Sequence, residues 1–221
     1  ALSSVSDNSP AALERATAAE IGADIGADAA AAAAAADLIA DAEAVATLSR
    51  SGTVLDALRR ANPTRVLLSE SRPGREGVGV AEALADDAAV TLTTDAAFGH
   101  ELAAWDAETL VVGADRVLLD GRVVNKVGTR AAALSAAEAG ADCYAVCGTD
   151  KVAPTADWAR EERDPAEVYD GDAAVDVSNP TFDVTPAHAV TVVTERGVLD
   201  AAAVEAVADA HRDRSEWVEN G

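Results

Sequence analysis

Three polar residues, Asp115, Asn125 and Lys126, have the types and spacing of a site for anion binding and proton transfer. Asp115 follows the apolar run 110–112, which predicts an acid at the carboxyl end of a strand. Asn125 and Lys126 stand just before an Ala-rich stretch that predicts a helix. Backbone N–H groups and the helix dipole favour a phosphate or carboxylate at such a helix start, and Lys126 adds a point charge. The alternative interpretation is a solvated acid and a surface lysine.

Two further loops carry matching chemistry at expected strand ends. Residues 47–53, TLSRSGT, place Arg50 and Ser51 before a helix, and residues 70–77, ESRPGREG, place Arg72 before another. Ligands of open α/β sheets bind outside the carboxyl ends of the strands. Arginines, hydroxyls and helix starts suit a phosphate there, although Ser51 alone could be a helix cap and Arg72 could pair with a neighbouring glutamate. Together the three loops predict a site for a phosphorylated small molecule.

The elements that would position these loops alternate between strand and helix. This alternation predicts an α/β fold with a mostly parallel sheet, helices on both faces and right-handed crossovers. Within the central stretch, Asp120-Gly121 predicts a hairpin turn. The expected strands cover 44–48, 65–70, 88–94, 109–115, 142–147 and 189–194, and the expected helices cover 54–61, 78–86, 95–105, 130–140 and 201–212.

The sequence changes near residue 45 from an Ala-rich stretch to the strand–helix alternation, which divides the chain into two expected parts. Residues 1–44 form a helical amino-terminal segment, with an Ala-rich helix expected from about Pro10 to about Ala42. Residues 45–221 form the Rossmann-like domain. Inside that domain, residues 148–189 break the alternation with four prolines and three aromatic side chains. We expect an ordered excursion over the sheet there, because the aromatic side chains need burial.

The acidic charge of the chain indicates the salt conditions in which it works more than the ligand that it binds. The formal net charge is −22, with 39 acidic and 17 basic residues, and the only lysines are Lys126 and Lys151. An acidic, lysine-poor surface on a normally patterned fold predicts adaptation to high salt, where screening removes self-repulsion. The same charge argues against direct nucleic-acid binding. With no apolar run of membrane length and no signal region, we expect a cytoplasmic protein without a membrane partner.

The two cysteines, Cys143 and Cys147, lie in the strand-like run DCYAVC. Their spacing is poor for a local disulfide or a CxxC metal site, and the three histidines form no ligand cluster with them. We therefore expect buried structural thiols, no metal site and no cofactor.

Five blocks of the sequence stand in an order typical of one family. They are ESRPGREG, the aspartate of TTDAA, GADRVLLDGRVVNKVGT, NPTFDVTP and TERGV. They resemble the family that contains the alpha, beta and delta regulatory subunits of translation initiation factor 2B, together with isomerases of methylthioribose 1-phosphate and ribose 1,5-bisphosphate. The resemblance covers roughly residues 45–198 and implies a Rossmann-like domain of the NagB/RpiA/CoA-transferase type that is cytoplasmic and dimeric or larger.

The sequence departs from the isomerase pattern at the catalytic thiol. The family isomerases carry a T-H-C-type loop that matches residues 47–49, and its cysteine acts with the aspartate that matches Asp115. Here Leu48 and Ser49 stand in place of the histidine and the cysteine. An alcohol does not replace a thiol as a proton-transfer acid, because a cysteine pKa of about 8.5 lies much closer to neutrality.

A second departure distinguishes between the isomerases. Thr149 and Lys151 resemble a T-x-K block of the initiation-factor branch, which argues against a methylthioribose isomerase and leaves the bisphosphate isomerase open. Family members also carry a longer helical amino-terminal domain, to which only the segment before Val45 corresponds here.

Three hypotheses for function follow. The first is a protein like the initiation factor 2B regulatory subunits that binds a sugar phosphate or nucleotide without efficient catalysis, as a homo-oligomer and with an initiation factor as a candidate partner. Its ligand would contact Arg50, Ser51, Arg72, Asn125 and Lys126. The second is an isomerase of phosphorylated pentoses that uses Asp115 without the cysteine. The third is a structural homodimer without a ligand.

Overall fold

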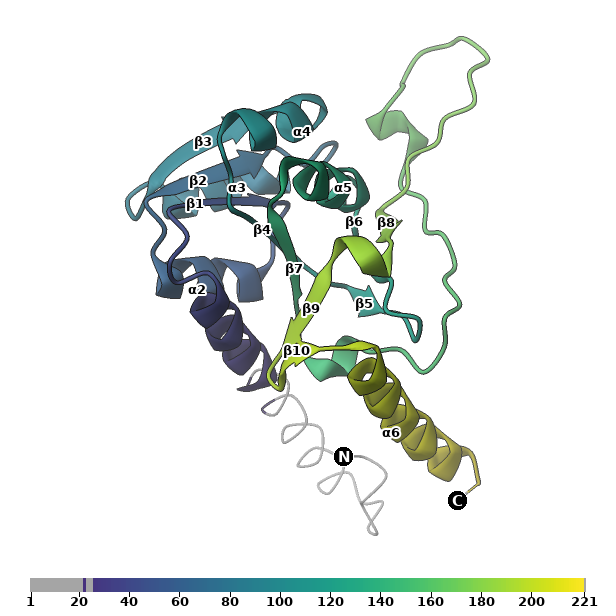
Figure 1. Ribbon diagram of the computed structural model, residues 1–221. Helices are drawn as coiled ribbons and strands as arrows, with labels where there is room; N and C mark the ends of the chain where they lie inside the picture. Colours follow the sequence, from purple (N-terminus) through teal and green to yellow (C-terminus); the bar gives the residue numbers. More distant parts are fainter. Residues whose placement is uncertain (1–21, 23–25, 221) are drawn as a thin grey trace.

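A seven-stranded sheet forms the centre of the computed structural model, which describes residue 22 and residues 26–220 of the chain (Figure 1). Its strand order is β10-β9-β7-β4-β1-β2-β3, and all neighbours pair in parallel except the β9–β10 hairpin. The prediction of a mostly parallel α/β fold is therefore confirmed. The strands are β1 (Ala44–Leu48), β2 (Arg65–Ser69), β3 (Ala89–Thr93), β4 (Thr109–Gly113), β7 (Asp142–Val146), β9 (Thr191–Thr194) and β10 (Gly197–Leu199).

Helices cover both faces of this sheet, and each face has its own apolar cluster. One cluster packs α4 (Asp95–Ala104), α5 (Thr129–Ala139) and α6 (Ala201–Asn220) against the sheet. The other packs α2 (Gly52–Ala61), α3 (Glu76–Leu84) and the Ala-rich helix over residues 26–38 against the opposite face. That last helix ends at residue 38, a few residues before the expected end at Ala42, and its expected start at Pro10 lies outside the described residues.

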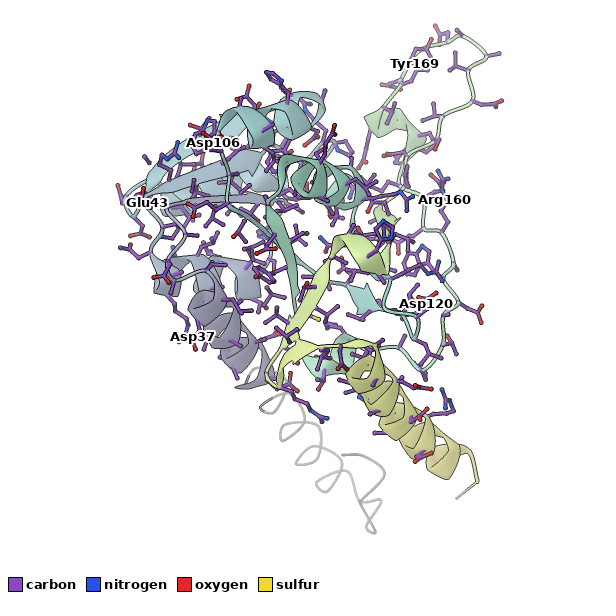
Figure 2. The ribbon with its side chains drawn as sticks, in the orientation of Figure 1. Asp37, Glu43, Asp106, Asp120, Arg160 and Tyr169 are labelled. Atoms are coloured by element: carbon purple, nitrogen blue, oxygen red, sulfur yellow. The ribbon has the colours of Figure 1, made fainter. Side chains whose placement is uncertain are left out.

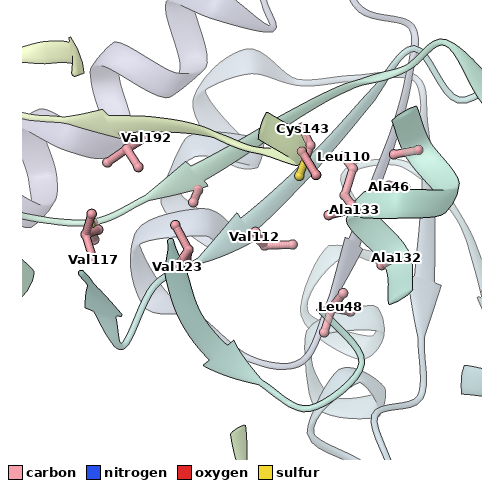
Figure 3. Packing of buried hydrophobic residues seen from close by; sticks show 14 of the residues in the cluster. Ala46, Leu48, Leu110, Val112, Val117, Val123, Ala132, Ala133, Cys143 and Val192 are labelled. Carbon is pink, nitrogen blue, oxygen red and sulfur yellow. The ribbon is translucent and has the colours of Figure 1, made fainter. Parts of the chain in front are cut away.

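The central strands are apolar on both faces because helices cover both. Every residue of β1 and β4 is buried. Along β4, Leu110 and Val112 belong to the α5 side, whereas Val111 belongs to the α2 side. Figure 3 shows the first of these clusters, where Leu110 and Val112 approach Ala132 and Ala133 of α5. The continuous apolar run of this strand is thus the sequence signature of its two-sided burial.

A second, three-stranded antiparallel sheet branches from the end of β4. Its strands are β5 (Arg116–Val117), β6 (Val123–Lys126) and β8 (Phe182–Thr185), in the order β5-β6-β8. The hairpin turn predicted at Asp120-Gly121 is present, with Gly121 at φ 79° and its N–H donating to the Leu118 carbonyl at 2.8 Å. This sheet places Asn125 and Lys126 at the end of β6.

The segment 148–189 is ordered, as expected, but only part of it packs against the rest of the protein. It supplies β8, and Trp158 contacts Phe182 edge-on with ring centroids 5.9 Å apart. Tyr169 does not need the burial that the sequence suggested: it is exposed on a stretch that projects from the body of the protein (Figures 1 and 2). The strands β8 and β10 were not predicted, because both are short and lie outside the strand–helix alternation.

The topology fixes where a ligand can bind. From β1 the chain adds β2 and β3 on one side, and then β4, β7 and β9 on the other. The switch point therefore lies between the carboxyl ends of β1 and β4, the position at which open α/β sheets bind ligands.

We predict that the stability of this fold depends on salt. Exposed acidic side chains point outward at separate places on the surface, among them Asp37, Glu43, Asp106 and Asp120 (Figure 2). With a net charge of −22, repulsion between them should grow as salt falls to 0.1 M, where the Debye length reaches about 10 Å. Lowering KCl from 2 M to 0.1 M should lower the melting temperature by at least roughly 5 °C, equivalent to about 1–3 kcal/mol for this chain length. Equal melting temperatures at both salt concentrations would rule this out, and an uncharged osmolyte in place of the salt is the control.

Candidate ligand pocket

A cavity of about 290 Å³ lies at the switch point between β1 and β4. It brings together six of the seven predicted site residues, and the seventh, Arg72, is not among its lining residues. The residues that line it come from three loops, from β6 and from the excursion before β8. They are Leu48, Ser49, Arg50, Ser51, Glu76, Gly113, Ala114, Asp115, Asn125, Lys126, Arg163, Thr181 and Phe182.

The loop after β1 presents Ser49 and Arg50 to the cavity. Ser49 has a left-handed backbone with φ 59°, and its N–H donates to the Ser71 hydroxyl at 2.6 Å. Ser51 caps α2 by accepting from the Val54 N–H at 3.3 Å, as the simpler interpretation of this serine suggested. The first N–H groups of α2 have no partner within the helix, so the start of α2 is a favourable place for an anion.

The end of β4 and the residues after it also line the cavity. A Cβ on Gly113 would lie 3.1 Å from the Ser51 side chain and 3.8 Å from the Asn125 Oδ1 atom, so glycine allows these two loops to approach. Two residues later, the Asp115 N–H donates to the Val124 carbonyl at 3.0 Å, which ties Asp115 to the hairpin.

The surroundings of Asp115 shift the pKa of its carboxyl. Desolvation by the surrounding protein raises the pKa of its carboxyl, Glu161 raises it further, and the charges of Lys151 and Lys126 oppose the shift. The net effect is a pKa above the ordinary value, although the side chain still reaches the solvent of the open pocket. A carboxyl with its pKa moved toward neutrality can accept or return a proton more readily than a surface aspartate.

The end of β6 supplies two buried polar side chains. Asn125 donates from Nδ2 to the Thr129 hydroxyl at 2.9 Å. Lys126 is only 6% exposed, and its Nζ lies 2.8 Å from Glu76 Oε1. Burial alone would raise the pKa of the Glu76 carboxyl, but its hydrogen bond and charge attraction with Lys126 outweigh burial and lower the pKa. Glu76 is therefore ionised at neutral pH, and the Lys126–Glu76 pair has no net charge.

The start of α5 is not available to a ligand, contrary to the expectation from the sequence. The carboxylate of Asp183 on β8 accepts from the N–H groups of Gly128 at 2.8 Å and Arg130 at 3.0 Å. Burial raises the pKa of Asp183, and the two backbone donors oppose that shift. An internal carboxylate thus fills the position that the sequence assigned to a bound anion.

This capping contact can be tested by its effect on stability. Replacing Asp183 by alanine removes both acceptors from the start of α5, so it should lower the free energy of unfolding by about 1–2 kcal/mol. Asp183→Asn keeps one acceptor and should lose less. Chemical denaturation measures both variants against Asp176→Ala, an exposed acid that should change stability by less than about 0.5 kcal/mol. No difference between Asp183→Ala and the Asp176→Ala control would contradict the capping role.

Arg72 lies next to the pocket rather than in it. Its side chain is 62% exposed and its Nε is 3.3 Å from Glu70 Oε2, the pairing that was its simpler interpretation. Its backbone N–H donates to Asp95 Oδ2 at 2.6 Å, and Asp95 also accepts from the Ser71 N–H. The aspartate of the TTDAA block therefore braces the loop that carries Glu76.

The sequence missed two charged residues of the pocket, Glu76 and Arg163. Glu76 lies in the block ESRPGREG, which the sequence assigned to a loop before a helix expected from residue 78, whereas in the structure it is the first residue of α3. Arg163 comes from the irregular excursion and carries no local signal. Its side chain is paired with Glu167, so two of the three cations lining the cavity already have carboxylate partners. Arg50, the third, makes no ion pair within the part of the chain that the structure describes.

Neither cysteine lines the cavity. Cys143 and Cys147 are buried and unbonded within the α5-side cluster, and burial raises the pKa of each thiol to about 12. The interpretation as buried structural thiols is confirmed by this burial. Among the described residues, no group of three or more His, Cys, Asp or Glu side chains could hold a metal ion. No helix in the described part of the chain has the length and hydropathy of a membrane span.

The sequence profile of the Initiation factor 2 subunit family matches residues 2–201. The chain belongs to this family. Two of its relatives are named as sugar-phosphate isomerases. A methylthioribose-1-phosphate isomerase of Pelotomaculum thermopropionicum is 35% identical over 175 residues, which cover 72% of this chain and 48% of the relative. A ribose 1,5-bisphosphate isomerase of Haloferax volcanii is 38% identical over 154 residues, covering 64% of this chain and 46% of the relative.

Solved structures of the Initiation factor 2 subunit family share the fold. The translation initiation factor eIF-2B of Pyrococcus horikoshii OT3 is 34% identical, with a TM-score of 0.71 over 85% of this chain and 67% of that chain. The delta subunit of eIF-2B from A. fulgidus is 26% identical, with a TM-score of 0.75 over 90% of this chain and 66% of that chain. The chain spans about half the length of the curated relatives it matches. The family thus joins initiation-factor subunits and isomerases, and the pocket residues must indicate which activity this chain has.

Proposed function

We propose that this chain binds a sugar phosphate in the β1–β4 pocket and converts it poorly or not at all, in the manner of a regulatory subunit. The observation that carries the proposal is the composition of the pocket: Arg50, Asn125 and Lys126 meet Asp115 in one cavity that holds Ser49 and no thiol. Binding groups for an anion and for hydroxyls are present together, whereas one of the expected pair of proton-transfer groups is absent from the lining.

The argument for binding rests on charge and position. Arg50 brings a positive charge that has no carboxylate partner among the described residues to the start of α2, where the first backbone N–H groups of a helix favour an anion. Asn125 and Lys126 offer hydrogen-bond donors to the oxygens of a sugar. A cavity of about 290 Å³ suits a small phosphorylated compound.

The argument against efficient turnover rests on proton transfer. Interconversion of an aldose and a ketose needs one group to take a proton from carbon and another to supply a proton to oxygen, and each typically contributes about 10²–10⁴-fold. Asp115 suits one role, but the Ser49 hydroxyl is a poor acid at neutral pH. Cys143 and Cys147 cannot substitute because they are buried outside the cavity.

A second candidate function is catalysis by a sugar-phosphate isomerase that relies on Asp115 alone. Two observations favour it: the raised pKa of Asp115, and the names of the relatives that match at 35% and 38% identity. Wild-type turnover that depends on Asp115 would support this candidate over the first.

A thermal-shift screen tests the proposed binding. Purified protein in 2 M KCl is melted with ribose 5-phosphate, ribose 1,5-bisphosphate, methylthioribose 1-phosphate and several nucleotides. A ligand at 100 times its Kd should add about 2.7 kcal/mol of stability. Stabilisation by a sugar phosphate that is lost in Arg50→Ala supports the proposal. If no phosphorylated compound stabilises the protein at millimolar concentration, the structural homodimer without a ligand becomes the better account.

We also expect the protein to be at least a homodimer. The expectation rests on the resemblance to a family whose members are dimeric or larger. Sedimentation equilibrium at micromolar concentration in high salt should therefore give at least twice the chain mass of 22.3 kDa. A single 22.3 kDa species under these conditions would contradict the prediction. An initiation factor remains our proposed protein partner, by analogy with the family.

A further inference from the structure

Lys126 and Glu76 form an ion pair whose two members both line the cavity. The Lys126 side chain is 8% exposed and the Glu76 side chain 29%, so solvent and salt screen this pair less than a surface pair. Their opposite charges cancel at distances beyond the pair itself. Lys126 therefore adds little net positive potential to a pocket in which it is the most buried cation.

Glu76 is held in this position by its surroundings. It is the first residue of α3, where a negative charge is favoured by the helix dipole. A Cβ on Gly74 would lie 2.5 Å from Glu76 Oε1 and 2.6 Å from Cδ, so the carboxylate lies against the Gly74 backbone. Its second oxygen, Oε2, is buried and has no hydrogen-bond partner among the described residues. Glu76 is therefore part of the pocket wall, with its other oxygen bonded to Lys126.

A phosphate bound directly at Lys126 Nζ would lie within a few ångströms of the Glu76 carboxylate, only 2.8 Å from that nitrogen. Two negative charges at such a separation repel strongly in a partly desolvated site. Arg50, which also lines the cavity, has no such neighbour among its ion-pair partners in the described residues. The charge of Lys126 is therefore compensated by a carboxylate of the pocket wall, whereas no described carboxylate compensates the charge of Arg50.

We propose that Glu76 is a specificity-determining residue: it keeps a phosphate away from Lys126 and reserves Lys126 for uncharged oxygens of the ligand. The phosphate then lies toward Arg50, and a hydroxyl or carbonyl oxygen lies toward Asn125 and Lys126. The ligand class is a phosphate ester of a small polyhydroxy compound, bound in one orientation, and inorganic phosphate is a poor ligand. This inference rests on the proposed function and adds the reason for its selectivity.

The experiment is a double-mutant cycle on Glu76 and Lys126, measured by calorimetry with two probes, inorganic phosphate and ribose 5-phosphate, at one fixed salt concentration. Glu76→Gln keeps the shape of the side chain and removes its charge. It should tighten the binding of inorganic phosphate by about tenfold or more, because the Lys126 charge is then uncompensated. In a Lys126→Met background the same substitution should change phosphate binding by less than about twofold. Glu82→Gln is the matched control, since Glu82 is an exposed acid of the same helix outside the cavity.

Each outcome decides between the inference and the function on which it rests. If Glu76→Gln does not tighten phosphate binding, or tightens it equally without Lys126, the inference is overturned. A gain of the same size in Glu82→Gln would overturn it too, since it would reflect only the overall charge. The proposed function has a separate readout, the binding of ribose 5-phosphate to the wild type. Its absence would contradict sugar-phosphate binding whatever Glu76→Gln does with inorganic phosphate.

Discussion

Ser49→Cys should raise isomerase activity on ribose 1,5-bisphosphate or methylthioribose 1-phosphate by roughly 10²-fold over the wild type, the lower range for one added proton-transfer group. Ser49 and Asp115 line the same cavity from the ends of the adjacent strands β1 and β4. A thiol with a pKa of about 8.5 would give the pocket the second proton-transfer group that an alcohol does not provide. Turnover is followed by the appearance of the ketose product.

The controls for this substitution separate chemistry from mere exposure of a thiol. Ser51→Cys puts a thiol on the same loop and in the same cavity, but at the cap of α2, so it should give no comparable gain. Asp115→Asn added to Ser49→Cys should remove the gained activity. If Ser49→Cys and the wild type turn over equally, the missing thiol is not what limits catalysis, and that part of the account is wrong.

Lys126→Ala should weaken sugar-phosphate binding by about 10–100-fold, because a charge-assisted hydrogen bond is worth about 1.5–3 kcal/mol. The substitution removes a donor from the ligand and leaves the Glu76 carboxylate without its partner, which adds a net negative charge to the pocket. Lys151→Ala is a close control, because Lys151 is the only other lysine of the chain and does not line the cavity. Titration calorimetry on both variants measures the difference.

The same substitution should also reduce stability. The Glu76 carboxylate would lose the partner that holds its pKa below the ordinary value, so the free energy of unfolding at neutral pH should fall by about 1–3 kcal/mol. In the wild type this contribution is present above the unfolded-state pKa of the glutamate and is lost as the pH falls through the lower folded-state pKa.

The binding experiment has its own contradicting outcome. If Lys126→Ala binds the sugar phosphate as tightly as Lys151→Ala, Lys126 has no role in the site.

The sheet and the place of the pocket could be predicted because their signals are local. The run Thr109–Gly113 is buried at every position and continuously apolar over Leu110–Val112, as a strand buried on both faces requires. Asp120-Gly121 specifies its turn within a few residues. Once these strands are assigned as parallel, the carboxyl ends that carry Ser49 and Asp115 must lie at one edge of the sheet, and so the site follows from the fold class.

The contacts that decide the chemistry of the pocket could not be predicted, because they join residues far apart in sequence. Lys126 meets Glu76 across 50 positions, and Asp183 reaches the start of α5 across more than 50. The pairing of β6 with β8 brings Asp183 to Gly128, and no local pattern in the proline-bearing excursion specifies that register. For the same reason an expected anion site at α5 proved to be filled by the protein, while the acid beside Lys126 went unpredicted.

Phosphorus-31 NMR of the wild-type protein with ribose 1,5-bisphosphate in 2 M KCl tests the central claim most directly, because one spectrum reports binding and turnover together. The account predicts that the substrate resonances broaden or shift as protein is added, and that no ketose bisphosphate resonance grows in over hours. Arg50→Ala and Lys126→Ala should reduce the broadening at the same protein concentration. Rapid growth of the product resonance with wild-type protein, lost in Asp115→Asn, would contradict a binding function without efficient catalysis and establish the isomerase in its place.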